Sequence, residues 1–199
     1  MNVYVLDIAP LRGREREALA LLSEERREKA LRIRREDARL RSIGAGLLLR
    51  EAGIASPFSY GGHGKPYIPG GVHFSLSHSG ELCALAVCGA PVGLDAEKIA
   101  PVRRAAARAL TDEEREFMET DPERRFAYLW TRKEAVLKCT GAGLSQPMNA
   151  FSALGDAAIL DGETLSLYTV EYGGYMLSTA VAAPSAAFVP RRVDASELL

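Results

Sequence analysis

The chain has few cysteines, and their number and spacing argue against a disulfide framework or a cysteine-based metal site. The three cysteines, Cys83, Cys88 and Cys139, are an odd number and lack metal-site spacing. Cys83 and Cys88 differ by five positions, so on one strand they would face opposite ways. We therefore predict that all three are reduced packing residues, as expected in a cytoplasmic protein.

Long apolar runs and an excess of either charge are also missing. The formal net charge is -1, so bulk electrostatics do not predict a nucleic-acid partner. No apolar run approaches the length of a membrane span. Residues 1–9 alternate like a strand and lack the basic start of a signal peptide. These absences predict a cytoplasmic protein that binds neither nucleic acid nor a membrane.

Several common catalytic motifs are absent as well. The sequence contains no Walker loop, dinucleotide-binding glycine fingerprint, His-Glu-x-x-His zinc motif or Gly-x-Ser-x-Gly elbow. With 199 residues, of which 47% are hydrophobic, the chain can form one large domain or two small halves with a sizeable core.

Arginines crowd the N-terminal part of the chain, where a helix is predicted. Ser23 resembles an N-cap followed by an acidic first turn, and the helical pattern continues to Arg50. Its arginines would lie on the open faces, around a buried stripe formed by Leu31, Leu40, Ile43, Leu47 and Leu48.

The remaining pattern predicts an α+β fold. Residues 72–97 are typical of a β-meander, with strands near 72–76, 82–88 and 92–96. Beyond it we predict helices at 103–119 and 123–139, then a hairpin of strands 165–172 and 175–181 around Gly173-Gly174. Both halves mix a helix with a small antiparallel sheet. We therefore predict two similar halves, residues 1–100 and 101–199, with a seam near 98–105.

Two carboxylates stand two positions apart on a predicted strand. Asp95 and Glu97 would share one face, while Leu94 and Ala96 point into the core. Adjacent like charges repel unless a cation lies between them, and oxygen-only ligands suit Mg²⁺. Taken alone, the pair equally fits a solvated end of a strand.

A second acidic residue lies on the predicted helix 123–139. Glu134 and Lys138 are four positions apart and could form an ordinary helical ion pair. However, Glu134 shares a face with Trp130 and Leu137, and a carboxylate beside apolar side chains needs a partner or a metal.

Two further segments display polar side chains at turns. Ser77-His78-Ser79-Gly80 ends an alternating strand, and these side chains can donate to phosphate oxygens. Gly64-Lys65-Pro66 places a lysine before a rigid turn. Alone, His78 equally fits a turn residue bonded to backbone, and Lys65 fits an exposed lysine. His63 and His73 have no partner pattern.

Taken together, four segments resemble the 4′-phosphopantetheinyl transferases, in their long, Sfp-type branch. The family pattern is Gly-Lys-Pro, Ser-His-Ser, Val/Ile-Gly-x-Asp-x-Glu and Trp/Phe-x-x-Lys-Glu-x-x-x-Lys. Its counterparts here, in the same order, are Gly64-Lys65-Pro66, Ser77-His78-Ser79, Val92-Gly93-Leu94-Asp95-Ala96-Glu97 and Trp130-Thr131-Arg132-Lys133-Glu134-Ala135-Val136-Leu137-Lys138.

The resemblance implies a fold and a reaction. The fold would be two similar α+β halves related by a pseudo-twofold, with coenzyme A bound at the seam and the chain acting as a monomer. The enzyme would move the 4′-phosphopantetheine arm of coenzyme A to a serine of an apo acyl or peptidyl carrier protein. Adenosine 3′,5′-bisphosphate would be released.

The resemblance also implies roles for individual residues. Asp95, Glu97 and Glu134 match ligands of Mg²⁺, for which Mn²⁺ is an alternative. Glu134 and Lys138 also match catalytic positions, Glu134 for the proton of the carrier serine and Lys138 for the departing phosphate. Lys133 and His78 match phosphate contacts, and Lys65, Pro66 and Ser77 match the lining of the nucleotide pocket.

Arg26, Lys29 and Arg41 match the basic positions that hold the 3′-phosphate, with Arg39 as an alternative to Arg41. Glu114 is matched to a further acid of unassigned role. Two other interpretations remain open: an inactive relative that only binds coenzyme A or a carrier protein, and a Mg²⁺-dependent phosphohydrolase that uses water as acceptor.

Overall fold

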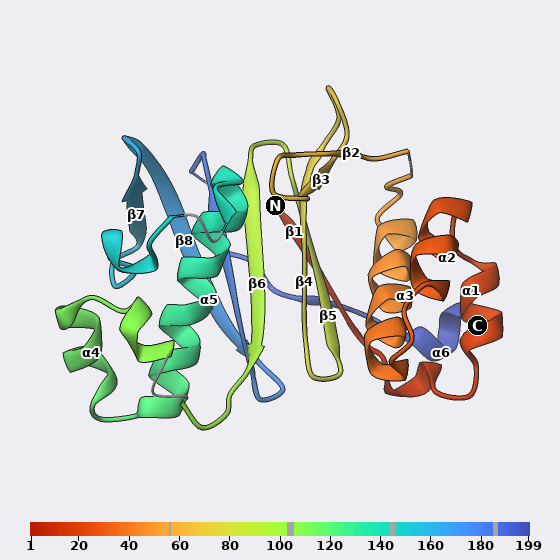
Figure 1. Cartoon of the computed structure of the whole chain (residues 1–199), viewed down its shortest axis with the longest axis horizontal. Coiled ribbons are helices and arrows are strands. Elements are labelled where there is room, and N and C mark those ends of the chain that lie inside the picture. The colour runs from red at the N-terminus through yellow and green to blue at the C-terminus, as the bar shows by residue number, and fades with distance from the viewer. Residues whose placement is uncertain (56, 103–105, 144–145, 185–186) are drawn as a thin grey trace.

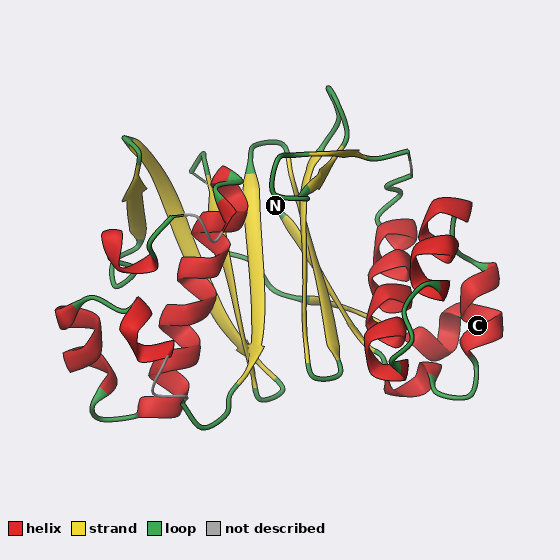
Figure 2. Cartoon of the chain, viewed as in Figure 1, coloured by secondary structure: helices red, strands yellow, loops and turns green. Residues whose placement is uncertain are grey.

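A computed structural model describes residues 1–55, 57–102, 106–143, 146–184 and 187–199. Two sheets lie in the middle of the molecule and helices cover the two outer sides (Figures 1 and 2). The described strands are β1 (Asn2–Asp7), β2 (Ser59–Tyr60), β3 (Pro66–Tyr67), β4 (His73–Ser79), β5 (Leu82–Cys88), β6 (Val92–Lys98), β7 (Ala157–Leu160), β8 (Glu163–Tyr172), β9 (Tyr175–Val181) and β10 (Arg191–Val193). The described helices are η1 (Ala9–Leu11), α1 (Glu15–Ala20), α2 (Glu24–Leu31), α3 (Glu36–Glu51), η2 (Ala106–Ala109), α4 (Asp112–Met118), α5 (Pro122–Thr140), η4 (Met148–Ala150) and α6 (Ala195–Leu198).

Each of the two larger sheets has four strands. The first has the order β10-β1-β5-β4, in which only β10 is parallel to its neighbour. The second has the order β6-β9-β8-β7 and is antiparallel throughout. The mixed α+β class and the hairpin at Gly173-Gly174 are therefore confirmed. Strand β10 also returns the C-terminal part of the chain to the N-terminal sheet.

The core has three layers of apolar contact. Helix α3 packs on β5 and β1 over one cluster that includes Leu47 and Leu85, and α5 packs on β6 and β9 over another that includes Val136 and Ala180. The third cluster lies between the two sheets and joins Val5 to Leu94. Across the molecule the order is helices, sheet, sheet, helices (Figure 1).

The N-terminal helical region differs from the prediction of one continuous helix. It forms two helices, because the chain leaves helical geometry after Leu31 and restarts at Glu36. Ser23 is the N-cap of α2, as predicted, and its hydroxyl accepts a hydrogen bond from the Arg26 amide. Leu31 lies at the end of α2 and is 61% exposed, so it does not join the stripe. The other four predicted members, on α3, are buried.

The predicted meander is also wrong in its third strand. β6 pairs with β9 in the second sheet and not with β5. Farther along, the helix expected at 103–119 is shorter. α4 starts only after Thr111, whose side chain forms a capping box with Glu114. Residues 103–105 of that prediction lie outside the described residues.

The two sheets meet where their edge strands β4 and β6 run side by side. Three alternate serines of β4 share one face. Their hydroxyls accept hydrogen bonds from the backbone N–H groups of β6 that point away from β9. Ser75 accepts from Leu94, Ser77 from Ala96 and Ser79 from Lys98, at 3.0, 3.2 and 3.1 Å. Side chains thus satisfy a strand edge that would otherwise be unpaired, and β4 is held against the strand that carries Asp95 and Glu97.

Candidate active site

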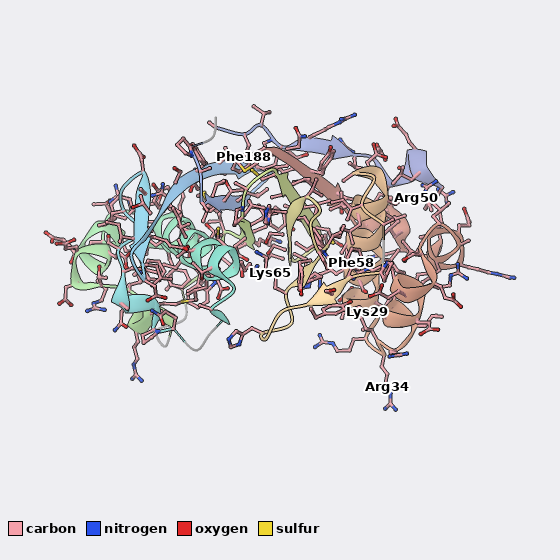
Figure 3. All side chains as sticks on the ribbon, turned by 90° about the horizontal axis from the view of Figure 1, so that it is seen from above. Lys29, Arg34, Arg50, Phe58, Lys65 and Phe188 are labelled. Atoms are coloured by element: carbon pink, nitrogen blue, oxygen red, sulfur yellow. The ribbon has the colours of Figure 1, made fainter. Side chains whose placement is uncertain are left out.

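A cavity of about 740 Å³ lies beside this junction. β4 and β6 contribute its floor, α2 and α3 one wall, α5 the opposite wall, and the segment around Lys65 a third side. In the view of Figure 3, Lys65 lies between the two halves, with Lys29 on the N-terminal side. The cavity is therefore built from segments far apart in the sequence.

Asp95 sits on β6 at the inner end of the cavity. Leu94 and Ala96 are fully buried on the opposite face, as the alternation predicts. The Asp95 carboxylate is only 4% exposed. Its Oδ1 accepts from Ser77 at 2.8 Å and from the Lys138 ammonium at 2.6 Å. Its Oδ2 is buried without a hydrogen-bond partner among the described residues, so one oxygen is left to bind a cation or a donor.

Glu97 and Glu134 line the same cavity from β6 and α5. Ser79 donates to Glu97 at 2.7 Å. Burial raises the pKa of Glu97, and the charge of Asp95 raises it further against the bond from Ser79. Burial likewise raises the pKa of Glu134, with added repulsion from Asp95 and Glu97. A cation placed among the three carboxylates would relieve this repulsion.

The three carboxylates do not yet form a finished metal site. Among the described residues, no three His, Cys, Asp or Glu side chains converge closely enough to hold a metal ion as they stand. Lys138 already engages Asp95, and Ser79 engages Glu97. The donor type and the free Asp95 oxygen fit Mg²⁺, but the side chains must rotate before all three could bind it.

Helix α5 presents Glu134 and Lys138 because its other faces are committed to the core. Ala135, Val136 and Leu137 are buried in the cluster under the helix. Trp130 lines the cavity one turn before Glu134 and stacks on Phe126, with ring centroids 5.5 Å apart. The i, i+4 spacing of Glu134 and Lys138 then brings both side chains to the cavity.

The opposite wall is basic. Arg26 and Lys29 come from α2 and Arg41 from α3, and all three line the cavity. Arg26 is 7% exposed and donates to the Ser42 carbonyl at 2.9 Å, while its Nε has no hydrogen-bond partner among the described residues. Arg39 lies elsewhere: its guanidinium pairs with Glu15 at 2.6 Å. The structure thus places Arg41, not Arg39, at the cavity.

The cavity is also lined by four further residues that were predicted to contact coenzyme A: Lys65, Pro66, Ser77 and His78. Desolvation lowers the pKa of His78, and the charges of Arg41 and Lys138 lower it further, which favours a neutral imidazole. Burial also lowers the pKa of Lys65. The Lys65 ammonium points at backbone carbonyls of α5 and β6.

Lys133, in contrast, is not brought to the cavity. Its side chain is fully buried behind α5, where the ammonium pairs with Glu114 at 2.9 Å. It also donates to the carbonyls of Met148 and Phe151 at 2.7 and 2.6 Å. The expected contact between Lys133 and phosphate does not fit this arrangement, because residues 133 and 134 point in different directions on a helix. Glu114 is likewise part of the core.

Comparison with known proteins identifies the family of this chain. The sequence model of the 4′-phosphopantetheinyl transferase superfamily matches residues 91–173. A 4′-phosphopantetheinyl transferase of Bacillus subtilis is 36% identical over 157 residues, covering 70% of this chain and 69% of that protein. The 4′-phosphopantetheinyl transferase Sfp of Bacillus subtilis (strain 168) is 33% identical over 171 residues, covering 76% and 75%. This chain belongs to the 4′-phosphopantetheinyl transferase superfamily, in its Sfp-type branch.

The stretch of the transferase that matches the superfamily model contains the three carboxylates and Lys138, whereas the basic wall lies outside it. None of the helices within the described ranges is long and apolar enough to cross a membrane.

Sequence reasoning gave His63 no role in the transferase cavity, noted Trp130 only as an apolar neighbour of Glu134, and noted Ser79 only as a donor to phosphate. His63 and Trp130 line this cavity, and Ser79 orients Glu97. The glycines around His63 and the spacing of Trp130 from Glu134 were available signals. The bond from Ser79 depends on how β4 meets β6, which no local pattern in the sequence specifies.

Proposed function

We propose that this transferase moves the 4′-phosphopantetheine arm of coenzyme A to a serine hydroxyl of an apo carrier protein and releases adenosine 3′,5′-bisphosphate. One observation carries this proposal: a single cavity joins a basic wall to a group of three carboxylates and a lysine. Such a cavity can hold the anionic nucleotide end of coenzyme A while its pyrophosphate reaches the carboxylate end.

The basic wall is proposed to hold the 3′-phosphate. Arg26, Lys29 and Arg41 converge on the cavity from two helices. A guanidinium fork matches the geometry of a phosphate, and the unpartnered Nε of Arg26 leaves donor capacity for it. His78 lies at the same side of the floor and would gain a partner when a phosphate binds, and Pro66 and Ser77 would line the nucleotide.

Mg²⁺, with Mn²⁺ as an alternative, is proposed to be held by Asp95, Glu97 and Glu134. The support is the oxygen-only donor set, the free Asp95 oxygen, and the raised pKa values of the two glutamates. When bound, the ion would neutralise pyrophosphate oxygens. A cation there would also compete with Lys138 for Asp95, so Lys138 would become available to the substrate.

Glu134 and Lys138 are proposed to perform the proton and charge transfer. Glu134 would take the proton of the carrier serine, directly or through a water. A carboxylate bound to Mg²⁺ is a weak base, which favours the route through a water. Lys138 stands one turn away and would stabilise the oxygen of the departing phosphate. The inactive-relative alternative is not favoured, because both groups are present at the cavity.

We further propose that the chain works as a cytoplasmic monomer whose two halves are related by a pseudo-twofold. Both walls of the cavity come from one chain, so no second copy is needed to complete it. Each four-stranded sheet carries one long helix, α3 or α5, which supports the internal symmetry. The sheets do not divide at residue 100, because β6 belongs to the second sheet and β10 to the first.

The test mixes the purified protein with coenzyme A, Mg²⁺ and a panel of apo carrier proteins, and weighs the carriers by intact mass spectrometry. We expect a Mg²⁺-dependent gain of one phosphopantetheine group on the serine. Glu134→Gln should abolish this gain while its circular dichroism and unfolding midpoint stay close to the wild type. Loss of coenzyme A without carrier modification would instead indicate a hydrolase, and near-normal transfer by Glu134→Gln would exclude the proposed site.

A further inference from the structure

The ammonium group of Lys65 is already bonded to the backbone of the protein. It donates to the carbonyl oxygens of Lys138 at 2.6 Å, Val92 at 3.0 Å and Cys139 at 3.5 Å. A lysine ammonium has three N–H donors and no acceptor. The contacts with Lys138 and Val92 are ordinary hydrogen bonds, whereas the one with Cys139 is at the outer limit. The backbone therefore engages two of the three hydrogens and lies near the third, so a phosphate would have to compete with these carbonyls.

These carbonyls belong to the two elements that carry the catalytic groups. Lys138 and Cys139 lie in the last turn of α5, where helix carbonyls lack partners and carry partial negative charge. Val92 is the first residue of β6, three positions before Asp95. Lys65 itself comes from the loop between β2 and β3, so its side chain links that loop to both α5 and β6.

The surroundings of Lys65 suit a cation that stabilises a helix end. Among the described residues no carboxylate forms an ion pair with it. Its charge is therefore balanced mainly by the C-terminal carbonyls of α5. A cation in a partly buried site of this kind interacts more strongly with a helix end than an exposed one does.

We propose that Lys65 is a positioning residue: it caps α5 and fixes Lys138 relative to Asp95, and it does not bind the nucleotide. The Lys138 carbonyl is held by Lys65 while the Lys138 ammonium reaches Asp95 at 2.6 Å. The same lysine holds the start of the strand that presents Asp95. This inference rests on the proposed function, because it assigns Lys138 and Asp95 to the reaction.

Lys29 provides a matched comparison in the same cavity. Lys29 is an exposed residue whose ammonium lies over the ring of Tyr60, 5.8 Å from the centroid. Figure 3 shows Lys29 on the N-terminal side, away from α5. Lys29 is placed to meet an incoming phosphate, whereas Lys65 faces the backbone. Replacing each lysine by methionine keeps most of the side-chain length and removes the charge.

The experiment compares Lys65→Met and Lys29→Met by calorimetric binding of coenzyme A and by carrier-protein turnover at saturating coenzyme A. For Lys65→Met we expect kcat to fall roughly tenfold, as for loss of a charged hydrogen bond, with Kd for coenzyme A changed by less than about twofold. For Lys29→Met we expect Kd to rise roughly tenfold. Hydrogen exchange should accelerate at residues 137–141 in Lys65→Met only.

Two results would overturn the proposal. One is a rise of Kd in Lys65→Met comparable to that in Lys29→Met, which would make Lys65 a nucleotide contact. The other is unchanged kcat with unchanged exchange at the end of α5. Lys65→Arg, which keeps the cation, should recover part of kcat and of the exchange protection.

Failure of the proposed function would look different. In that case the wild type itself would modify no carrier in the panel, while the binding and exchange measurements would still report whether Lys65 caps α5 or contacts coenzyme A.

Discussion

At the scale of single residues, the buried pair of Lys133 and Glu114 shows how one helix position can belong to the core while the next belongs to the site. Both side chains are fully buried. The Glu114 carboxylate also accepts from the amides of Thr111 and Ala153 at 2.8 Å each. The pair therefore joins α4, α5 and the segment after η4, and supports the back of the helix that presents Glu134.

Lys133→Met is expected to lower the free energy of unfolding by about 3–5 kcal/mol, because it leaves the Glu114 charge buried without its partner. Urea denaturation measures this. Lys133→Met combined with Glu114→Gln should be more stable than the single variant, since no unpaired charge remains. Coenzyme A should bind the folded double variant with near wild-type Kd. A large loss of affinity in the double variant would instead indicate that Lys133 contacts a phosphate of coenzyme A.

A buried thiol should make the stability depend on alkaline pH. Burial raises the pKa of Cys83 to about 12, so the folded state keeps a proton that the unfolded state loses near its ordinary value. The stabilising contribution is present below about pH 9 and is lost between about pH 9 and 12. The stability advantage of the wild type over Cys83→Ala should shrink by about 1.4 kcal/mol per pH unit above pH 9. Urea titrations in which the wild type keeps the same stability advantage over Cys83→Ala up to pH 10.5 would contradict this pH dependence.

At the scale of elements, the site depends on the close approach of β6 and α5. Gly93 is the point of contact: a Cβ there would lie 1.9 Å from the Ala135 carbonyl oxygen and 2.5 Å from the Cys139 amide nitrogen. Both are helix backbone atoms, which cannot move without displacing α5. The absence of a side chain at residue 93 therefore sets how near Asp95 comes to Lys138.

Gly93→Ala is expected to destabilise the protein by about 3 kcal/mol or more, at or beyond the upper end of ordinary overpacking, and to reduce transfer in whatever fraction still folds. Gly89→Ala is the matched control. Gly89 is exposed and a Cβ there would meet no atom within 4 Å, so its effect should stay within about 0.5 kcal/mol. Unfolding midpoints of both variants test this; equal stability of the two would exclude the tight α5–β6 contact.

At the scale of the whole molecule, local patterns predicted the elements better than their partners. The alternation of Leu94 and Ala96 with Asp95 and Glu97 correctly gave the faces of β6. It could not reveal that β6 pairs with β9, because pairing depends on residues about 80 positions away. The same limit applies to β10, which joins the first sheet from the far end of the chain. The break after Leu31 was hidden because charged residues there are compatible with a helix.

The candidate site shows the same difference between what local patterns predict and what depends on tertiary contacts. The motif resemblance predicted that Asp95, Glu134 and Lys138 share one site, and the structure places all three at one cavity. It did not distinguish the direction of Lys133 from that of its neighbour, nor the carbonyls that engage Lys65. Those depend on packing of α5 against the segment after η4 and on the path of the β2–β3 loop, which are set by tertiary contacts and not by spacing.

Because the cavity draws on both halves and the apolar cluster between the sheets is shared, ligand binding should stabilise the molecule as one unit. Desulfo-coenzyme A, which lacks the thiol, should raise the free energy of unfolding by about 2.7 kcal/mol at a concentration of 100 times its Kd. Fluorescence of Trp130, the single tryptophan, reports on α5, and pulsed alkylation of Cys83, read by peptide mass spectrometry, reports on the sheet under α3. Both urea midpoints should shift by the same amount. If only one shifts, the two halves unfold separately and the ligand is held by one of them, contrary to a site built across the seam.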